Sequence, residues 1–405
     1  MNDHHSNPTR PMRVLYIARA PFISGAERAL MSMLRHLDRS RIEPHLALGQ
    51  ESDLVQQAKA LDIPVSILAV PKRTPATLLG WWRSLWRLSR LVKDWQPDMM
   101  HANDVPSCQA MSVVGRKQNV PRVVHVRWVI SAEGAGWWAR DGAEVMLCIS
   151  RWILSELGSP KGTPLEKARY EVLHDAIDWP ALAGSELWVP GSELNESTLN
   201  PESETRNPEL GTLNPKLTLG FTGQLIESKG LDMVIAAMGR LPVDKRPRLL
   251  VAGEDTQTGG VYKEKLQVLA AQCGVANLVE WLGFVGDVAT VHRRVDAMVC
   301  PSRIEPLGLV PLEAARFSVP TLASRTGGLA ETIEHGVTGL LTDPGAEAWT
   351  AILEQAHDRT ALQRMGMAAH VRTKQHYSPA VYQDRLMEVY QSVIRTSAKP
   401  QAATV

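Results

Sequence analysis

Short apolar segments alternate with amphipathic ones along the first part of the chain. "MRVLYIARA" precedes a glycine-containing turn and the amphipathic "GAERALMSMLRHL", and further apolar segments end in polar or small residues, as in "EPHLALG", "PDMMHAND", "PRVVHVRW" and "AEVMLCIS". Strands that alternate with helices indicate a parallel sheet covered on both faces. Residues 12–184 are therefore predicted to form one doubly wound α/β domain.

A second series of the same kind begins at "LTLGFTGQL" and continues through "PRLLVAGED", "VDAMVCPS", "VPTLASRTGG" and "TGLLTDPG". It predicts a second doubly wound domain over residues 217–376. Two Rossmann-like domains in tandem would face each other across a cleft, and ligands bind at the carboxyl ends of such strands. Residues that directly follow a strand are accordingly the first candidates for a site.

The remaining segments differ in composition. Residues 185–216 are rich in Glu, Ser, Asn and Pro and contain "TLNP" twice, which predicts a disordered insert between the domains. Disorder is also predicted for residues 1–11, and a loose tail for 398–405. Residues 377–397 carry an amphipathic pattern, and we expect this helix to pack back toward the N-terminal domain.

Charge and cysteine content exclude several classes. Lys and Arg number 44 and Asp and Glu 43, so the net charge of +1 gives no general attraction to nucleic acid. The four cysteines show no CxxC spacing that would indicate a zinc site or a disulfide framework. The first residues are polar and lack the apolar core of a signal peptide, and the chain lacks the run of about 18 apolar residues that a membrane-spanning helix needs. We therefore expect a cytoplasmic protein.

Three segments after predicted strands carry candidate chemistry. "FTGQLIESKG" places Gly223 in a turn and Lys229 before a helix, an arrangement suited to a phosphate group. "EPLGLVPLE" places Glu305 and Glu313 around Gly308, and carboxylates accept hydrogen bonds from sugar hydroxyls. "SRTGGLAETI" forms a third strand-to-helix turn. Taken singly, each segment is equally consistent with a residue that has no functional role: a surface lysine, a solvated glutamate or an ordinary turn.

Taken together and in this order, these segments resemble the retaining glycosyltransferases of family 4, which have the GT-B fold. The resemblance rests on "GQLIESKG", "LGFVGDV", "VCPSRIEPLGLVPLEA", "TGGLAETIEHGVTGLL" and, in the N-terminal domain, "SGAER". It implies transfer of a sugar from a nucleotide diphosphate sugar to a glycan or lipid-linked acceptor. No metal and no further cofactor are expected.

The resemblance also implies roles for particular residues. Glu305 would face the donor sugar near the reacting centre, Glu313 would bind the ribose and Lys229 the diphosphate. Further donor-binding positions are Gly223, Gln224, Leu282, Ile304, Gly308, Leu309 and Val310. A turn formed by Ser24, Gly25, Glu27 and Arg28 would face the donor phosphate and the acceptor.

The sequence departs from the family pattern at two positions. Gln224 stands where family members usually carry an arginine, and Ser24 where they often carry a glycine. Glutamine donates a hydrogen bond but has no charge, so Arg28 or Arg303 is a candidate to replace the missing phosphate cation. The family also has a histidine after one of the later N-terminal strands; His125 and Arg127 are the candidates for contact with the sugar or the acceptor, and His101 is a weaker one.

Two other classes stay open at this point. A nucleotide-sugar epimerase can share two Rossmann-like domains, and a non-catalytic homologue that binds a nucleotide sugar would explain Gln224 and Ser24.

The segment "TLLGWWRSLWRLSRLVKDW" has a distinct pattern. Trp81, Leu85, Leu88, Val92 and Trp95 form one helical stripe that should pack on the sheet, while Trp82 and Trp86 lie beside Arg83, Arg87, Arg90 and Lys93. Tryptophan next to arginine suits an anionic membrane surface, so we expect peripheral membrane contact through Trp82 and Trp86. The alternative is a core helix whose two flanking rings shield the stripe.

Overall fold

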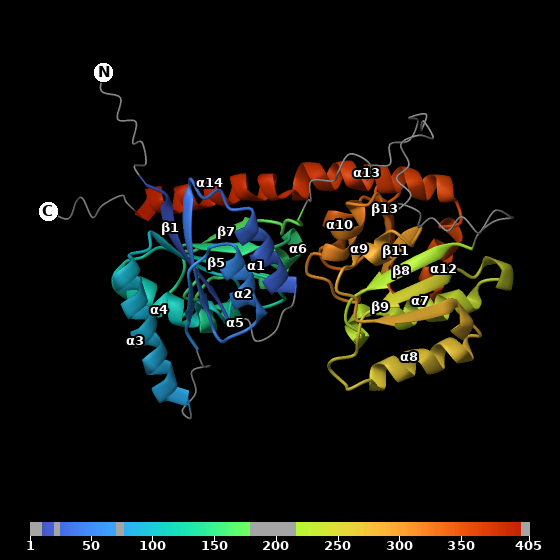
Figure 1. The fold of residues 1–405 in the computed structure, drawn as a ribbon, viewed down its shortest axis with the longest axis horizontal. Coiled ribbons are helices and arrows are strands. Elements are labelled where there is room, and N and C mark those ends of the chain that lie inside the picture. The colour runs from blue at the N-terminus through green and yellow to red at the C-terminus, as the bar shows by residue number, and fades with distance from the viewer. Residues whose placement is uncertain (1–9, 20–24, 70–76, 179–215, 398–405) are drawn as a thin grey trace, which may run out of the picture. The chain divides into compact units, whose positions relative to one another are not determined.

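A computed structural model describes residues 10–19, 25–69, 77–178 and 216–397. The predicted disordered insert except Lys216, the predicted tail, Ser24 and nearly all of the predicted N-terminal disorder lie outside these ranges. The chain divides into two compact units, one of Met1–Asp178 with Ser378–Val405 and the other of Trp179–Tyr377. Each unit is described by itself (Figure 1).

Unit 1 is built on a seven-stranded parallel sheet in the order β3-β2-β1-β4-β5-β6-β7. Its strands are β1 (Met12–Ala18), β2 (Ile42–Leu48), β3 (Val65–Ile67), β4 (Met99–Ala102), β5 (Arg122–Val126), β6 (Val145–Cys148) and β7 (Arg169–Val172). Its helices are α1 (Gly25–Arg35), α2 (Asp53–Ala60), α3 (Leu78–Trp95), α4 (Cys108–Gln118), α5 (Ala132–Trp138), α6 (Arg151–Leu157) and α14 (Pro379–Ser397). The order reverses between β1 and β4, which is the switch point where such sheets bind ligands.

Unit 2 has a six-stranded parallel sheet in the order β10-β9-β8-β11-β12-β13. Its strands are β8 (Thr218–Thr222), β9 (Arg248–Ala252), β10 (Val279–Gly283), β11 (Ala297–Cys300), β12 (Thr321–Ser324) and β13 (Gly339–Thr342). Its helices are α7 (Leu231–Arg240), α8 (Val261–Gln272), α9 (Ala289–His292), α10 (Leu309–Ala315), α11 (Leu329–Thr332), α12 (Ala346–Gln355) and α13 (Arg359–Tyr377), and short 3-10 turns lie at Glu227–Lys229, Val243–Lys245 and Ala276–Leu278. The two sheets confirm the prediction of tandem doubly wound domains.

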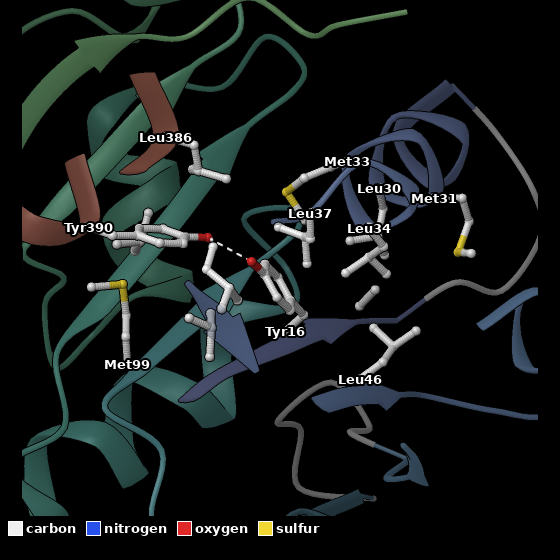
Figure 2. Packing of buried hydrophobic residues seen from close by; sticks show 14 of the residues in the cluster. Tyr16, Leu30, Met31, Met33, Leu34, Leu37, Leu46, Met99, Leu386 and Tyr390 are labelled. Atoms are coloured by element: carbon white, nitrogen blue, oxygen red, sulfur yellow. Dashed lines mark hydrogen bonds between the residues drawn. The ribbon is translucent and has the colours of Figure 1, made fainter. Parts of the chain in front are cut away.

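The C-terminal helix α14 completes the core of unit 1. Its apolar face, with Leu386, Met387 and Val393, belongs to the same buried cluster as Val14 of β1 and Leu30 of α1. Figure 2 shows Leu386 and Tyr390 beside the sheet residues Tyr16 and Met99. Burial of an apolar side chain of this size contributes roughly 1.5–3 kcal/mol, so the helix stabilises a sheet made more than 200 residues earlier in the chain.

A chain of polar groups crosses this otherwise apolar core. The hydroxyl of Tyr390 hydrogen-bonds Nδ1 of His101 and lies 3.3 Å from the hydroxyl of Tyr16. Nε2 of His101 lies 2.7 Å from Nδ1 of His125, whose Nε2 lies 3.5 Å from the hydroxyl of Tyr382. Burial lowers the pKa of His101 to about 3 and that of His125 well below its usual value, so both rings are neutral at neutral pH.

The long helix α3 packs by the stripe that its spacing predicts. Trp81, Leu85, Leu88 and Val92 are buried, and Trp95 is partly buried at the end of the helix. Gln96 stops the helix in a left-handed conformation. The opposite face leaves Leu79, Trp82 and Trp86 exposed by 83, 59 and 63 %. The stripe is thus buried as both interpretations expect, and the two tryptophans are more than half exposed.

Candidate functional site

Three loops of unit 2 meet at Glu305, which lies in the loop between β11 and α10. The ammonium of Lys229, in the turn after β8, lies 2.6 Å from Oε2 of Glu305. The hydroxyl of Ser302 donates to the same oxygen at 2.9 Å. The loop after β12 joins them, because Gly328 N–H donates to the Glu305 carbonyl at 2.9 Å and the Thr326 hydroxyl to that of Ser302 at 2.7 Å. The three segments singled out in the sequence thus meet at the loop that carries Glu305, and two of them contact its carboxylate.

Glycine at position 230 makes this approach geometrically feasible. Gly230 has a φ of +67°, and a Cβ atom added there would lie 2.1 Å from the carbonyl oxygen of Pro301. A side chain would therefore separate the turn that carries Lys229 from the loop that carries Glu305. Gly308 has a similar role at the start of α10, since its φ is +92° and a Cβ would lie 2.5 Å from Cδ2 of Leu329.

The ion pair is charged and only partly accessible. The side chain of Lys229 is 29 % exposed and that of Glu305 is 13 % exposed. Burial disfavours the ammonium charge of Lys229, but the charge of Glu305 outweighs this effect and raises the pKa of the lysine. The site thus holds a permanent cation whose counter-ion is one side chain of the same site.

A second ion pair, between Arg303 and Asp232, ties the loop that carries Glu305 to the turn before α7 and the start of that helix. The guanidinium of Arg303 donates to Asp232 at 2.7 and 2.9 Å and to the Glu227 carbonyl at 2.6 Å. Burial would raise the pKa of Asp232, but hydrogen bonds from Arg303 and Tyr262 and the charge of Arg303 lower it. Arg303 is thus held by Asp232 in this structure, and its suggested role as a replacement phosphate cation stays a prediction.

The other predicted donor-binding residues surround the ion pair in the sequence and keep their roles as predictions. Leu309, Val310 and Glu313 lie in the first two turns of α10. Gly223 directly follows β8, Gln224 beside it is exposed, Ile304 is exposed next to Glu305, and Leu282 at the end of β10 packs against a small apolar cluster.

In unit 1, the predicted turn is the first turn of a helix. Gly25, Glu27 and Arg28 belong to α1, with Arg28 exposed and Glu27 buried. The side-chain amide of Asn103, after β4, donates to the carbonyl of Ala26 at 3.2 Å and ties this turn to the switch point. Contact of these residues with a ligand stays a prediction.

The expectation that His125 or Arg127 contacts the sugar or the acceptor does not fit the structure. His125 is fully buried between His101 and Tyr382, and the weaker candidate His101 is buried with it. Arg127 is buried as well, pairs with Asp175 and donates to the Asn103 carbonyl at 2.9 Å. The position of these two residues at a central strand suggested a functional role, but their partners come from β4, from α14 and from the segment after β7, which the local sequence does not reveal.

Sequence reasoning also missed Ser302 and Asp232. Both lie beside recognised motif residues, Ser302 three positions before Glu305 and Asp232 three positions after Lys229. Only the folded structure shows that Ser302 orients Glu305 and that Asp232 binds Arg303, 71 positions away in the chain.

Comparison with known proteins defines the class. The model of the glycosyl transferase 4-like domain matches residues 24–176, and that of glycosyl transferases group 1 matches residues 203–392. Solved structures of Anabaena HepE in complex with UDP and with UDP-glucose have TM-scores of 0.76 and 0.75 at 19 and 20 % identity, and the alignments cover 94 % of this chain and 100 % of theirs. The fold of the chain is the tandem Rossmann-like GT-B fold.

The chain belongs to the group 1 glycosyltransferases of family 4. It is 28 % identical over 326 residues to glycogen synthase of Mycobacterium tuberculosis. The alignment covers 78 % of this chain and 74 % of that protein. It is also 28 % identical over 236 residues to a GDP-mannose-dependent alpha-(1-6)-phosphatidylinositol monomannoside mannosyltransferase of the same organism, covering 55 % and 60 %. This membership rules against the epimerase interpretation.

Proposed function

We propose that this glycosyltransferase moves a sugar from a nucleotide diphosphate sugar to a glycan or lipid-linked acceptor, with retention at the anomeric carbon. The observation that carries the proposal is the Lys229–Glu305 ion pair at the point where three strand-to-helix loops of unit 2 meet. Support for the donor class comes from HepE, which binds UDP and UDP-glucose, and from the GDP-mannose-dependent relative.

Lys229 and Glu305 would exchange partners when the donor binds. The diphosphate offers Lys229 two negative groups in place of one carboxylate, and Glu305 is then free to accept hydrogen bonds from the hydroxyls of the donor sugar. Ser302 keeps the carboxylate in place during this exchange, because its hydroxyl holds Oε2 from within the loop. Glu313, in the second turn of α10, would bind the ribose.

In the reaction, the acceptor oxygen bonds to the anomeric carbon as the bond from that carbon to the phosphate oxygen breaks. The hydroxyl proton passes to the released diphosphate, and attack on the face that the leaving group vacates retains the configuration. Lys229 and the amides at the start of α10 stabilise the charge that develops on the leaving group. No metal or further cofactor is required in this scheme.

Donor binding and turnover test the proposal directly. The wild-type protein is incubated with uridine, guanosine and adenosine diphosphate sugars while its thermal unfolding and the release of nucleoside diphosphate are measured. One nucleotide class should raise the unfolding temperature, since a ligand at 100 times its Kd contributes about 2.7 kcal/mol, and the same class should be turned over. Release in this incubation is hydrolysis, with water as the acceptor, and shows catalysis; absence of both binding and release would contradict the proposal.

We also propose that the protein acts in the cytoplasm and lies peripherally on the inner membrane surface through α3. Among the described residues, every helix falls short of the length or apolarity needed to cross a bilayer. The exposed Leu79, Trp82 and Trp86 form an apolar ridge, and Arg83, Arg87, Arg90 and Lys93 lie beside it, all of them exposed. Such a face suits an anionic lipid surface, where each cation contributes roughly 1 kcal/mol.

Replacing both Trp82 and Trp86 by alanine should remove most of the binding to anionic vesicles. The wild-type protein is expected to sediment with phosphatidylcholine vesicles that contain phosphatidylglycerol and much less with phosphatidylcholine alone, because the cations then have no counter-charge. Trp137→Ala, at another exposed tryptophan of unit 1, is the matched control and should sediment like the wild type. Equal sedimentation of the double variant and the wild type would reject this surface.

A further inference from the structure

Four tryptophans follow β5 and β6 at the carboxyl edge of the unit 1 sheet. Trp128, Trp137 and Trp138 lie after β5 and Trp152 lies after β6, and all four are at least partly exposed. Trp81 and Trp349, in contrast, are buried in the cores of the two units. The tryptophans at this edge thus contribute less to the core than their size allows.

Helix α5 packs by its small residues and leaves its two indoles outside this contact. The buried positions of the helix are Ala132, Ala135 and Gly136, and a Cβ added to Gly136 would lie 3.0 Å from Cδ of Pro164. Trp137 is 45 % exposed, and Glu133, one turn earlier on the same face, is exposed too. The helix therefore presents a flat apolar ring and a carboxylate together.

These rings reach the switch point of the sheet. Arg19 directly follows β1, its backbone N–H donates to the hydroxyl of Ser107 after β4 at 3.0 Å, and its guanidinium lies 6.0 Å from the centre of the Trp138 ring. The ring of Trp137 meets that of Trp138 edge-on at 4.7 Å. An aromatic surface thus extends from the carboxyl ends of β1 and β4, where open α/β sheets bind ligands.

We infer that Arg19, Glu133, Trp137 and Trp138 form a binding surface for a pyranose ring of the acceptor. This inference rests on the proposed transfer to an acceptor that carries a sugar. A pyranose has an apolar face of C–H groups, which suits an indole ring, and hydroxyls at its edge, which suit a guanidinium donor and a carboxylate acceptor. The carboxylate beside Trp137 also sets this surface apart from the ridge of α3, whose neighbours are cations that suit anionic lipid.

Saturation-transfer NMR with methyl glucopyranoside, methyl mannopyranoside and methyl galactopyranoside tests the surface, with nucleoside diphosphate present in excess. At least one glycoside should receive magnetisation at its ring C–H protons from the wild-type protein. In Trp137→Ala the affinity for that glycoside should fall about 3–10-fold, the range that loss of one aromatic contact produces, and Trp137→Phe should restore part of it.

Three controls separate this inference from its alternatives. Trp86→Ala removes another exposed tryptophan, from α3, and should leave the signal unchanged. Glu305→Ala should also keep it, because the glycoside would bind unit 1 and not the donor site of unit 2. Absence of a signal in the wild type, or an equal affinity in Trp137→Ala, overturns the inference. Lack of donor binding or turnover would refute the proposed function, whereas a positive glycoside signal would still support the sugar-binding surface.

Discussion

Lys229→Met is expected to lower kcat/KM for the nucleotide sugar by about 10²–10³-fold, the usual effect of removing one group that stabilises developing charge. The leaving diphosphate needs a cation, and Lys229 is the one that the structure holds at the meeting point of the three loops. Gln224 lacks a charge, and Arg303 is engaged by Asp232. Gln224 therefore cannot replace the charge of the lysine, and Arg303 would first have to leave Asp232.

The measurement compares release of nucleoside diphosphate by the variant and the wild type with the donor identified in the binding screen. Lys265→Met, at an exposed lysine of α8, is the matched control and should retain wild-type activity. Thermal unfolding of both variants separates lost catalysis from lost folding, because Lys229 lies in a partly accessible ion pair. A Lys229→Met protein that folds normally and keeps more than about a tenth of the wild-type kcat/KM would contradict the assignment.

Arg127→Met should have the largest effect on stability and lower the free energy of unfolding by about 3–5 kcal/mol. Arg127 and Asp175 form an ion pair whose side chains are 3 and 6 % exposed. Burial opposes the charge of Arg127, but Asp175 outweighs it, so the pKa of the guanidinium is raised. Asp104 is buried nearby and also interacts electrostatically with Arg127, so loss of the arginine removes the cation from both Asp175 and Asp104.

Chemical unfolding of the variant and the wild type checks this expectation. Glu280→Gln, which removes the exposed Arg294–Glu280 pair at 3.0 Å, is the matched control and should cost less than about 1 kcal/mol. Combining Arg127→Met with Asp175→Leu should recover much of the loss, because an apolar pair no longer leaves Asp175 buried and unpaired. If Arg127→Met were no more destabilising than the control, the ion pair would have no structural role.

The alternation of apolar and amphipathic segments was sufficient to predict both sheets, since parallel strands with helical connections leave a clear pattern. The approach of Lys229 to Glu305 could also be anticipated, because both residues lie in loops that follow strands, and the carboxyl ends of parallel strands share one edge of the sheet. The partners of His125 and Arg127 could not be anticipated from the sequence. They come from β4, from α14 and from the segment after β7, and no local pattern shows which distant group a buried polar side chain will contact.

The place of α14 has a consequence for how the chain folds during synthesis. The helix belongs to unit 1, yet roughly 200 residues of unit 2 are made before it. At ~5–20 residues per second, the sheet of unit 1 waits about 10–40 s for the helix that completes its core. During this interval its uncovered strands are open to chaperones, and the second unit can reach its final form before the first.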